Sequence, residues 1–118
     1  MSETTTIYHN AACSKSRAAM AELAGREVRV INYLATPPSR AELLELLSLL
    51  VDEPSALVRR DAAFTAAGLT GADVDSAEQV ATVLAEHPEL MERPVIVARG
   101  RAIIGRPTSR VREFLAEG

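Results

Sequence analysis

The feature that most constrains the fold is a strand–helix–strand pattern near the start of the chain. Thr4–Tyr8 is rich in β-branched and aromatic residues and is followed by a helix-favouring run, Arg17–Ala24. Gly25 ends that helix, and Val28–Tyr33 alternates as a second strand. Two strands joined through a helix lie parallel in one sheet, with a right-handed crossover. The loop after the first strand, residues 9–16, is therefore expected at the carboxyl edge of the sheet.

The middle of the chain is expected to be helical. Ser39-Arg40-Ala41-Glu42 and Ser76-Ala77-Glu78-Gln79 are capping boxes, and each predicts a helix behind it. The residues that would face the core form one stripe on each of these helices: Leu43, Leu46, Leu47 and Leu50 on the first, and Val80, Val83 and Leu84 on the second. Between them we expect helices over Ser55–Arg60 and Ala62–Ala67. His87-Pro88 ends the block, with His87 expected at the surface.

The C-terminal part predicts two strands and a helix. Val95–Ala98 and Ala102–Ile104 are apolar runs separated by Arg99-Gly100-Arg101, which is typical of a β-hairpin whose turn is supplied by glycine. A terminal helix follows through Val111, Phe114 and Leu115. The order is βαβ, a helical block, then ββα. We therefore predict an α/β fold, a thioredoxin-like mixed sheet with a helical block inserted at about residues 39–88, in a single domain over residues 1–118.

Composition narrows the classes of function. The formal net charge of −3 does not favour a nucleic-acid partner, and no apolar run reaches the roughly 18 residues that a membrane span needs. A single cysteine excludes an intramolecular disulfide, and the N-terminus lacks the pattern of a secretory signal. We expect a cytoplasmic protein with no nucleic-acid partner, no membrane association, no metal and no tightly bound cofactor.

The only cysteine, Cys13, is the candidate nucleophile. It lies in the loop between the first strand and the first helix, at or next to the helix N-terminus. Backbone N–H groups and the positive end of the helix dipole favour a thiolate there, and Lys15 and Arg17 add to this effect. The same N–H groups can bind an oxyanion. Ser16 stands where a dithiol motif has its second sulfur, so no disulfide can form across Cys13-x-x-Ser16. The alternative interpretation is a buried and inert cysteine.

Arginines could supply the rest of an anion site. Arg93-Pro94 and Arg106-Pro107 bracket the predicted hairpin, and each proline favours an extended conformation for the arginine before it, at the end of a strand. A third candidate is Arg59, with Arg60 as its rival. Planar guanidinium groups bind tetrahedral oxyanions bidentately, although each arginine taken alone is better explained as a solvated surface charge.

Several motifs in one order carry a resemblance. They are Ile7-Tyr8-His9-Asn10 through Cys13-Ser14-Lys15-Ser16-Arg17, Tyr33-Leu34 with Pro37-Pro38, Ala56-Leu57-Val58-Arg59, His87-Pro88, Leu90-Met91-Glu92-Arg93-Pro94 and Gly105-Arg106-Pro107. With these motifs the chain resembles the arsenate reductase family that uses glutathione and glutaredoxin, from about Ile7 to Leu115. That family has a thioredoxin-like fold with an extra helical block.

The resemblance implies an activity and roles for particular residues. Cys13 would attack arsenate, Arg59, Arg93 and Arg106 would hold the oxyanion, and His9 and Ser16 would tune the thiolate. Glutathione would be the co-substrate, and glutaredoxin, as the partner protein, would complete the reduction to arsenite. The Arg93-Pro94 bond would be cis.

Two other functions remain open within the wider superfamily. One is a single-cysteine binding or regulatory protein that responds to thiol oxidation, for example by glutathionylation of Cys13. The other is a glutaredoxin-like thiol transferase that acts on glutathione mixed disulfides. Both would lack arsenate activity.

Overall fold

The computed structural model describes residues 4–117. In chain order its elements are β1 (Thr5–His9), α1 (Ser14–Glu22), β2 (Val28–Asn32), α2 (Arg40–Leu49), the 3₁₀ helix η1 (Pro54–Leu57), α3 (Ala62–Ala66), η2 (Gly71–Val74), α4 (Ala77–Glu86), η3 (Pro88–Leu90), β3 (Val95–Ala98), β4 (Arg101–Ile104) and α5 (Thr108–Ala116). The predicted order βαβ, helical block, ββα is confirmed.

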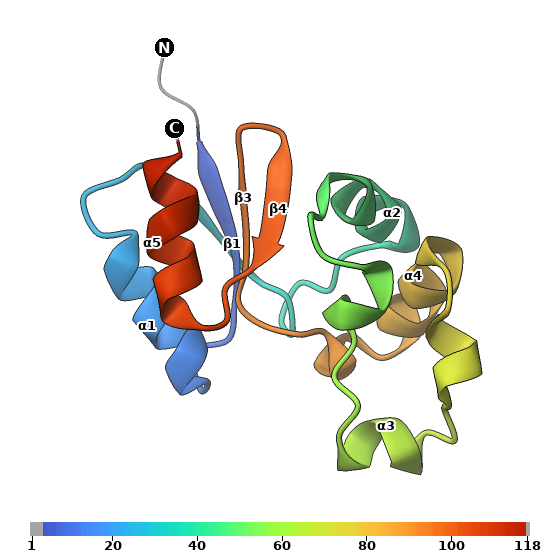
Figure 1. Ribbon diagram of the computed structural model, residues 1–118. Coiled ribbons are helices and arrows are strands. Elements are labelled where there is room, and N and C mark those ends of the chain that lie inside the picture. The colour runs from blue at the N-terminus through green and yellow to red at the C-terminus, as the bar shows by residue number, and fades with distance from the viewer. Residues whose placement is uncertain (1–3, 118) are drawn as a thin grey trace.

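The strands form one mixed sheet in the order β2-β1-β3-β4. β1 runs parallel to β2, with Ile7 opposite Val30, and antiparallel to β3, with Ile7 opposite Ile96. The carboxyl end of β1, the start of β3 and the end of β4 therefore meet at one edge of the sheet. In Figure 1 this edge is at the lower end of the sheet, and the start of β1 and the end of α5 lie at the upper end.

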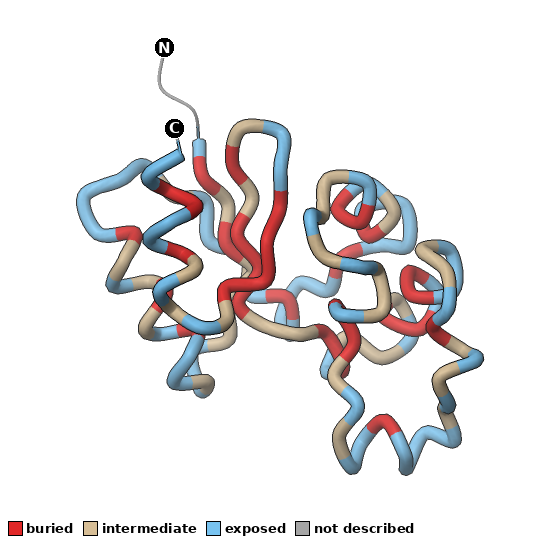
Figure 2. Tube along the Cα trace, viewed as in Figure 1, coloured by how far each residue is buried: buried red, intermediate tan, exposed pale blue. Residues whose placement is uncertain are grey.

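The helices form layers on the two sides of the sheet. α1 and α5 lie on one side, whereas α2 and α4 of the helical block lie on the other (Figure 1). Alternate residues of each central strand serve the two sides: Ile96 of β3 packs with α1 and α5, and Val95 packs with the helical block. Figure 2 shows the buried residues concentrated in the sheet and in the inward faces of the helices, while α3 is mostly exposed.

Local signals in the sequence explain the helix boundaries. Ser39 and Ser76 both close capping boxes, with Glu42 and Gln79 as the reciprocal partners, as predicted. Most of the predicted core-facing residues are buried, namely Leu43, Leu46 and Leu47 on α2 and Val80, Val83 and Leu84 on α4. Leu50, predicted in the same stripe, is the C-cap residue after α2 and is only partly buried. α1 begins at Ser14, three residues before the predicted run, so Cys13 is its N-cap residue.

One predicted helix is wrong. Instead of a helix over Ser55–Arg60 there is a short 3₁₀ helix, η1, that ends at Leu57. Its neighbour Val58 leaves the helix to form an antiparallel bridge with Met91. Both residues are buried, so burial and two long-range backbone hydrogen bonds outweigh the local preference for a helix.

The hairpin turn is tighter than expected. It contains two residues, Arg99 and Gly100, both with positive φ (55° and 70°), and Arg101 already belongs to β4. A turn with two left-handed residues matches the twist of the paired strands. Arg99 is held in this conformation by its side chain, which stacks 4.8 Å from the centroid of the Phe114 ring and donates to the Phe114 carbonyl.

No helix among residues 4–117 is both long and apolar enough to cross a membrane.

Candidate active site

Cys13 stands where a helix begins at the carboxyl edge of the sheet. It is partly exposed, and its backbone N–H donates to the Asn10 carbonyl at 3.0 Å, which folds the loop between β1 and α1. Asn10 Oδ1 also accepts from the Ala12 N–H, and Arg17 Nη1 donates to the Ala11 carbonyl. The loop is thus held by its own polar groups, and the sulfur is left at its surface.

The surroundings of the sulfur favour the thiolate. Partial burial opposes ionisation of Cys13, but the N–H groups of Ser16 and Lys15 at the start of α1 and the Arg93 guanidinium outweigh it, so the pKa of the thiol is lowered. Lys15 thus lowers the pKa of Cys13, as predicted, but it does so through its backbone N–H rather than its side chain.

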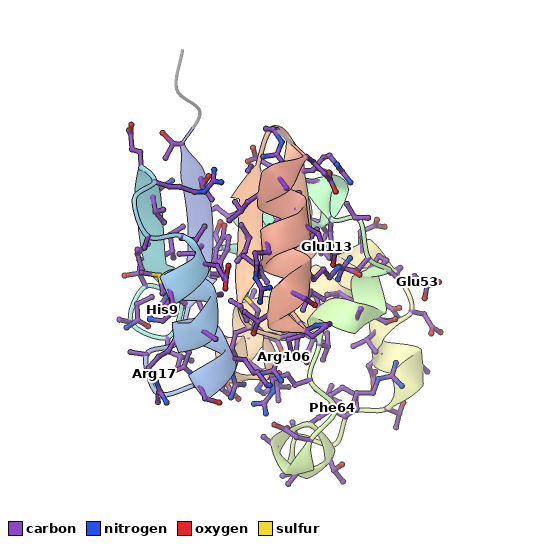
Figure 3. The ribbon with its side chains drawn as sticks, turned by 60° about the vertical axis from the view of Figure 1, so that its left-hand side comes forward. His9, Arg17, Glu53, Phe64, Arg106 and Glu113 are labelled. Atoms are coloured by element: carbon purple, nitrogen blue, oxygen red, sulfur yellow. The ribbon has the colours of Figure 1, made fainter. Side chains whose placement is uncertain are left out.

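Arg106 approaches the sulfur from a distant part of the chain. Its Nη2 donates to Cys13 Sγ at 3.6 Å, although 93 positions separate the two residues. Gly105 makes this possible, because a Cβ there would lie 2.8 Å from Val111 Cγ2 and 3.0 Å from Pro94 Cγ. Figure 3 shows Arg106 at the end of α5 that lies toward His9 and Arg17.

Arg93 lies beside the Cys13 sulfur as well. Burial lowers the pKa of its guanidinium, but Cys13 and Tyr33 outweigh this, so the pKa is raised. Its Nε is buried and has no hydrogen-bond partner within the described part of the chain. The Arg93-Pro94 bond is cis, and so is the Arg106-Pro107 bond.

The structure separates the two rival arginines. Arg59 points toward the site, with its Nε 3.8 Å from Glu92 Oε1 and its Nη1 3.2 Å from Asp61 Oδ2. Arg60 points away, with its guanidinium 5.9 Å from the centroid of the Phe64 ring. Of the two, Arg59 lies with the other predicted anion ligands.

The side chains of His9 and Ser16 lie under the loop and bond to each other, whereas the backbone N–H of Ser16 serves the sulfur. Ser16 is fully buried, its Oγ accepts from the Asn10 N–H at 2.9 Å, and it lies 2.7 Å from His9 Nδ1. Burial lowers the pKa of His9, and Arg17 lowers it further, so the imidazole is neutral at pH 7. In the tautomer protonated on Nε2, His9 Nδ1 accepts a hydrogen bond from the Ser16 hydroxyl. His9 and Ser16 therefore support the loop that carries Cys13.

Sequence reasoning missed two residues of this region. Glu92 lies between Arg59 and Arg106, and its position directly before the Arg93-Pro94 dipeptide was the signal that could have found it. Tyr33 is buried next to the site: burial raises the pKa of its phenol, while Asn10, Arg93 and Arg59 pull that pKa down. Tyr33 directly follows β2, whose carboxyl end lies beside that of β1, and this parallel pairing was the signal that could have found it. Within residues 4–117 no three His, Cys, Asp or Glu side chains gather where a metal ion could bind.

Comparison with known proteins identifies what the chain is similar to. The ArsC family model matches residues 8–114. An arsenate reductase from Neisseria meningitidis serogroup A is 35% identical over 113 residues, which is 92% of this chain and 96% of that protein. The uncharacterised protein YfgD of Escherichia coli is 38% identical over 118 residues, 98% of this chain and 99% of its own length. The structure of an arsenate reductase from Vibrio cholerae superimposes with a TM-score of 0.84 at 38% identity, covering 96% of this chain and 98% of that one.

Proposed function

The chain belongs to the ArsC family, and from this we propose that it reduces arsenate to arsenite with Cys13 as the nucleophile. The observation that carries the proposal is the contact of Arg106 Nη2 with Cys13 Sγ at the first turn of α1. A thiolate, a guanidinium and the N–H groups of a helix start are the parts needed to bind a tetrahedral oxyanion and attack it.

Arg59, Arg93 and Arg106 are proposed as the ligands of the oxyanion. The buried Nε of Arg93 has no partner among the described residues, and an anion oxygen would satisfy it. Arg106 already reaches the sulfur, so an anion that it binds would be held next to the nucleophile. Guanidinium groups match the geometry of such an anion better than ammonium groups do.

In the first step the Cys13 thiolate attacks arsenic and forms an S–As bond, while an arsenate hydroxyl group takes up a proton from solvent and leaves as water. The arginines and the N–H groups of Ser16 and Lys15 lie where negative charge has to be neutralised during this substitution. The side chains of His9 and Ser16 act in positioning, because they hold the loop and make no hydrogen bond to the sulfur among the described contacts.

The reduction needs two electrons, and two thiols outside this chain can supply them. Glutathione displaces a second water from the bound arsenic. A glutaredoxin thiol then attacks the glutathione sulfur, so that a mixed disulfide forms and the electron pair of the broken S–As bond reduces As(V) to As(III). Water cleaves the remaining bond, which releases arsenite and the Cys13 thiolate. Ser16 stands where a second internal thiol would attack, so the chain cannot resolve the intermediate alone. These co-substrates imply a reducing compartment, the cytoplasm.

The test is arsenate-dependent oxidation of NADPH, coupled through glutathione reductase, glutathione and glutaredoxin. Turnover should require every component and should vanish in Cys13→Ser, whereas thioredoxin with its reductase should support little. Sustained turnover with thioredoxin alone would overturn the proposed electron source. Reduction of a glutathione mixed disulfide without arsenate activity would identify a thiol transferase. Absence of both activities, with Cys13 readily glutathionylated, would identify a regulatory protein.

A further inference from the structure

One carboxylate oxygen lies between two of the arginines proposed to bind the anion. Glu92 Oε1 is 3.3 Å from Nε of Arg106 and 3.8 Å from Nε of Arg59. The same oxygen accepts from the Arg93 backbone N–H at 3.2 Å. The Glu92 carboxylate thus lies against all three arginines: against the side chains of Arg59 and Arg106, and against the backbone of Arg93.

The backbone fixes the pair of Arg59 and Glu92. Val58 and Met91 form an isolated antiparallel bridge, in which the Arg59 N–H donates to the Leu90 carbonyl and the Glu92 N–H donates to the Leu57 carbonyl, both at 2.7 Å. The residues on either side of these bonds are buried in the core. Arg59 and Glu92 therefore lie diagonally across the bridge, a separation that long side chains can span.

Arg106 is fixed independently. Its Nε donates to the Arg93 carbonyl at 2.7 Å, and the Gly105 N–H donates to the Pro94 carbonyl at 2.8 Å. The two arginines come from segments far apart in sequence, and both turn their Nε toward Glu92. The terminal nitrogen Nη2 of Arg106 contacts Cys13 Sγ. On Arg59, Nη1 pairs with Asp61 Oδ2 at 3.2 Å, so Nη2 is the nitrogen that Arg59 can offer to an anion.

We propose that Glu92 is a positioning residue that holds Arg59 and Arg106 together through their Nε atoms, so that their terminal nitrogens are preorganised for the anion. Two guanidinium groups this close repel each other, and the shared carboxylate offsets that repulsion while no anion is bound. The negative charge also acts on the sulfur, because it partly cancels the arginine that contacts Sγ. The inference rests on the proposed function in taking this region as the anion site.

The test separates the charge of Glu92 from its oxygen. Glu92→Gln keeps an acceptor of the same shape and removes the charge, whereas Glu92→Ala removes both. Sulfate binding can be measured as protection of Cys13 from iodoacetamide, and the thiol pKa from the pH dependence of the unprotected rate. Glu89→Gln is the matched control, because Glu89 lies nearby on η3, is exposed, and faces His87 rather than the arginines.

We expect Glu92→Gln to bind sulfate at least as tightly as the unaltered protein and Glu92→Ala to bind it about threefold to tenfold more weakly. Both should lower the Cys13 pKa by roughly a few tenths of a unit, because the arginine charges near Sγ are then no longer partly cancelled, and Glu89→Gln should change neither quantity. Tighter sulfate binding by Glu92→Ala would mean that Glu92 only repels anions, and an unchanged thiol pKa in Glu92→Gln would mean that its charge does not reach the sulfur. Either result overturns the proposal. Neither measurement uses arsenate turnover, so a protein inactive on arsenate would contradict the proposed function and leave this test intact.

Discussion

Replacing Ser16 with alanine tests whether the loop under Cys13 is held as described. Ser16 is fully buried, and its hydroxyl serves the Asn10 N–H at 2.9 Å and His9 Nδ1 at 2.7 Å. Leaving a buried group without a partner costs about 1–3 kcal/mol. His9 is partly exposed and can bond to water, so the Asn10 N–H dominates the cost. We expect Ser16→Ala to lower the free energy of unfolding by about 2 kcal/mol, which corresponds to roughly 8 °C in Tm for a domain of this size.

The control is Ser48→Ala, because Ser48 is exposed on α2 and donates only to the Glu45 carbonyl one turn earlier. Alanine is the better helix former by a few tenths of a kcal/mol, so this variant should be neutral or slightly stabilised. Urea unfolding of both variants gives the comparison. In the folded Ser16→Ala protein the pKa of Cys13 should also rise, because the N–H groups that favour its thiolate lose their support. Equal midpoints for the two variants, or an unchanged thiol pKa, would refute this account of Ser16.

Three further predictions follow from the site. The rate of alkylation of native Cys13 should increase with pH and then level off, with an inflection below the usual thiol pKa of about 8.5, because the folded protein favours the thiolate. An inflection at or above that value would contradict the lowered pKa. In steady-state assays, Arg59→Ala should raise KM for arsenate about tenfold or more while Arg60→Ala changes it less than twofold, since only Arg59 faces the site; the reverse pattern would mean that Arg60 is the ligand. Gly105→Ala should lower the free energy of unfolding by about 1–3 kcal/mol, because the added Cβ overpacks the site. Gly71→Ala should lower it little in the same urea titration, because its Cβ would meet only the flexible Arg60 side chain. Equal losses in the two variants would rule out close packing at Gly105.

The sequence predicted most of the fold because the relevant signals are local. A capping box needs only four consecutive residues, so Ser39 and Ser76 marked the starts of α2 and α4 correctly. The crossover rule then made β1 and β2 parallel without any knowledge of the rest of the chain. The prediction over Ser55–Arg60 was wrong because the competing partner, Met91, is distant in sequence. No local pattern reports such a bridge.

The site residues, like the elements of the fold, could be predicted where the signal is local and not where it depends on distant segments. The position of Cys13 at a helix start follows from residues next to it, and the approach of Arg93 and Arg106 to one sheet edge follows from the hairpin. The choice between Arg59 and Arg60 depends on which side of the chain faces the site after the bridge at Val58, and a helical interpretation of that segment gives no answer. Glu92 was missed for a related reason, because its partners become neighbours only through that bridge.

The site rests on two hydrophobic cores, one on each side of the sheet. The Cys13 loop leads into α1, which packs through Ala19 on the side of Ile96 and α5. Arg59 and Glu92 are anchored by Leu57 and Met91 in the other core, with the helical block. The hairpin that carries Arg93 and Arg106 contributes alternate residues to both. Loosening the helical block therefore displaces Arg59 and Glu92 while the sulfur keeps the N–H groups of α1. Thiolate reactivity and affinity for the oxyanion are thus supported by different parts of the chain, and a mutation in the block can weaken anion binding in a protein whose Cys13 still reacts normally.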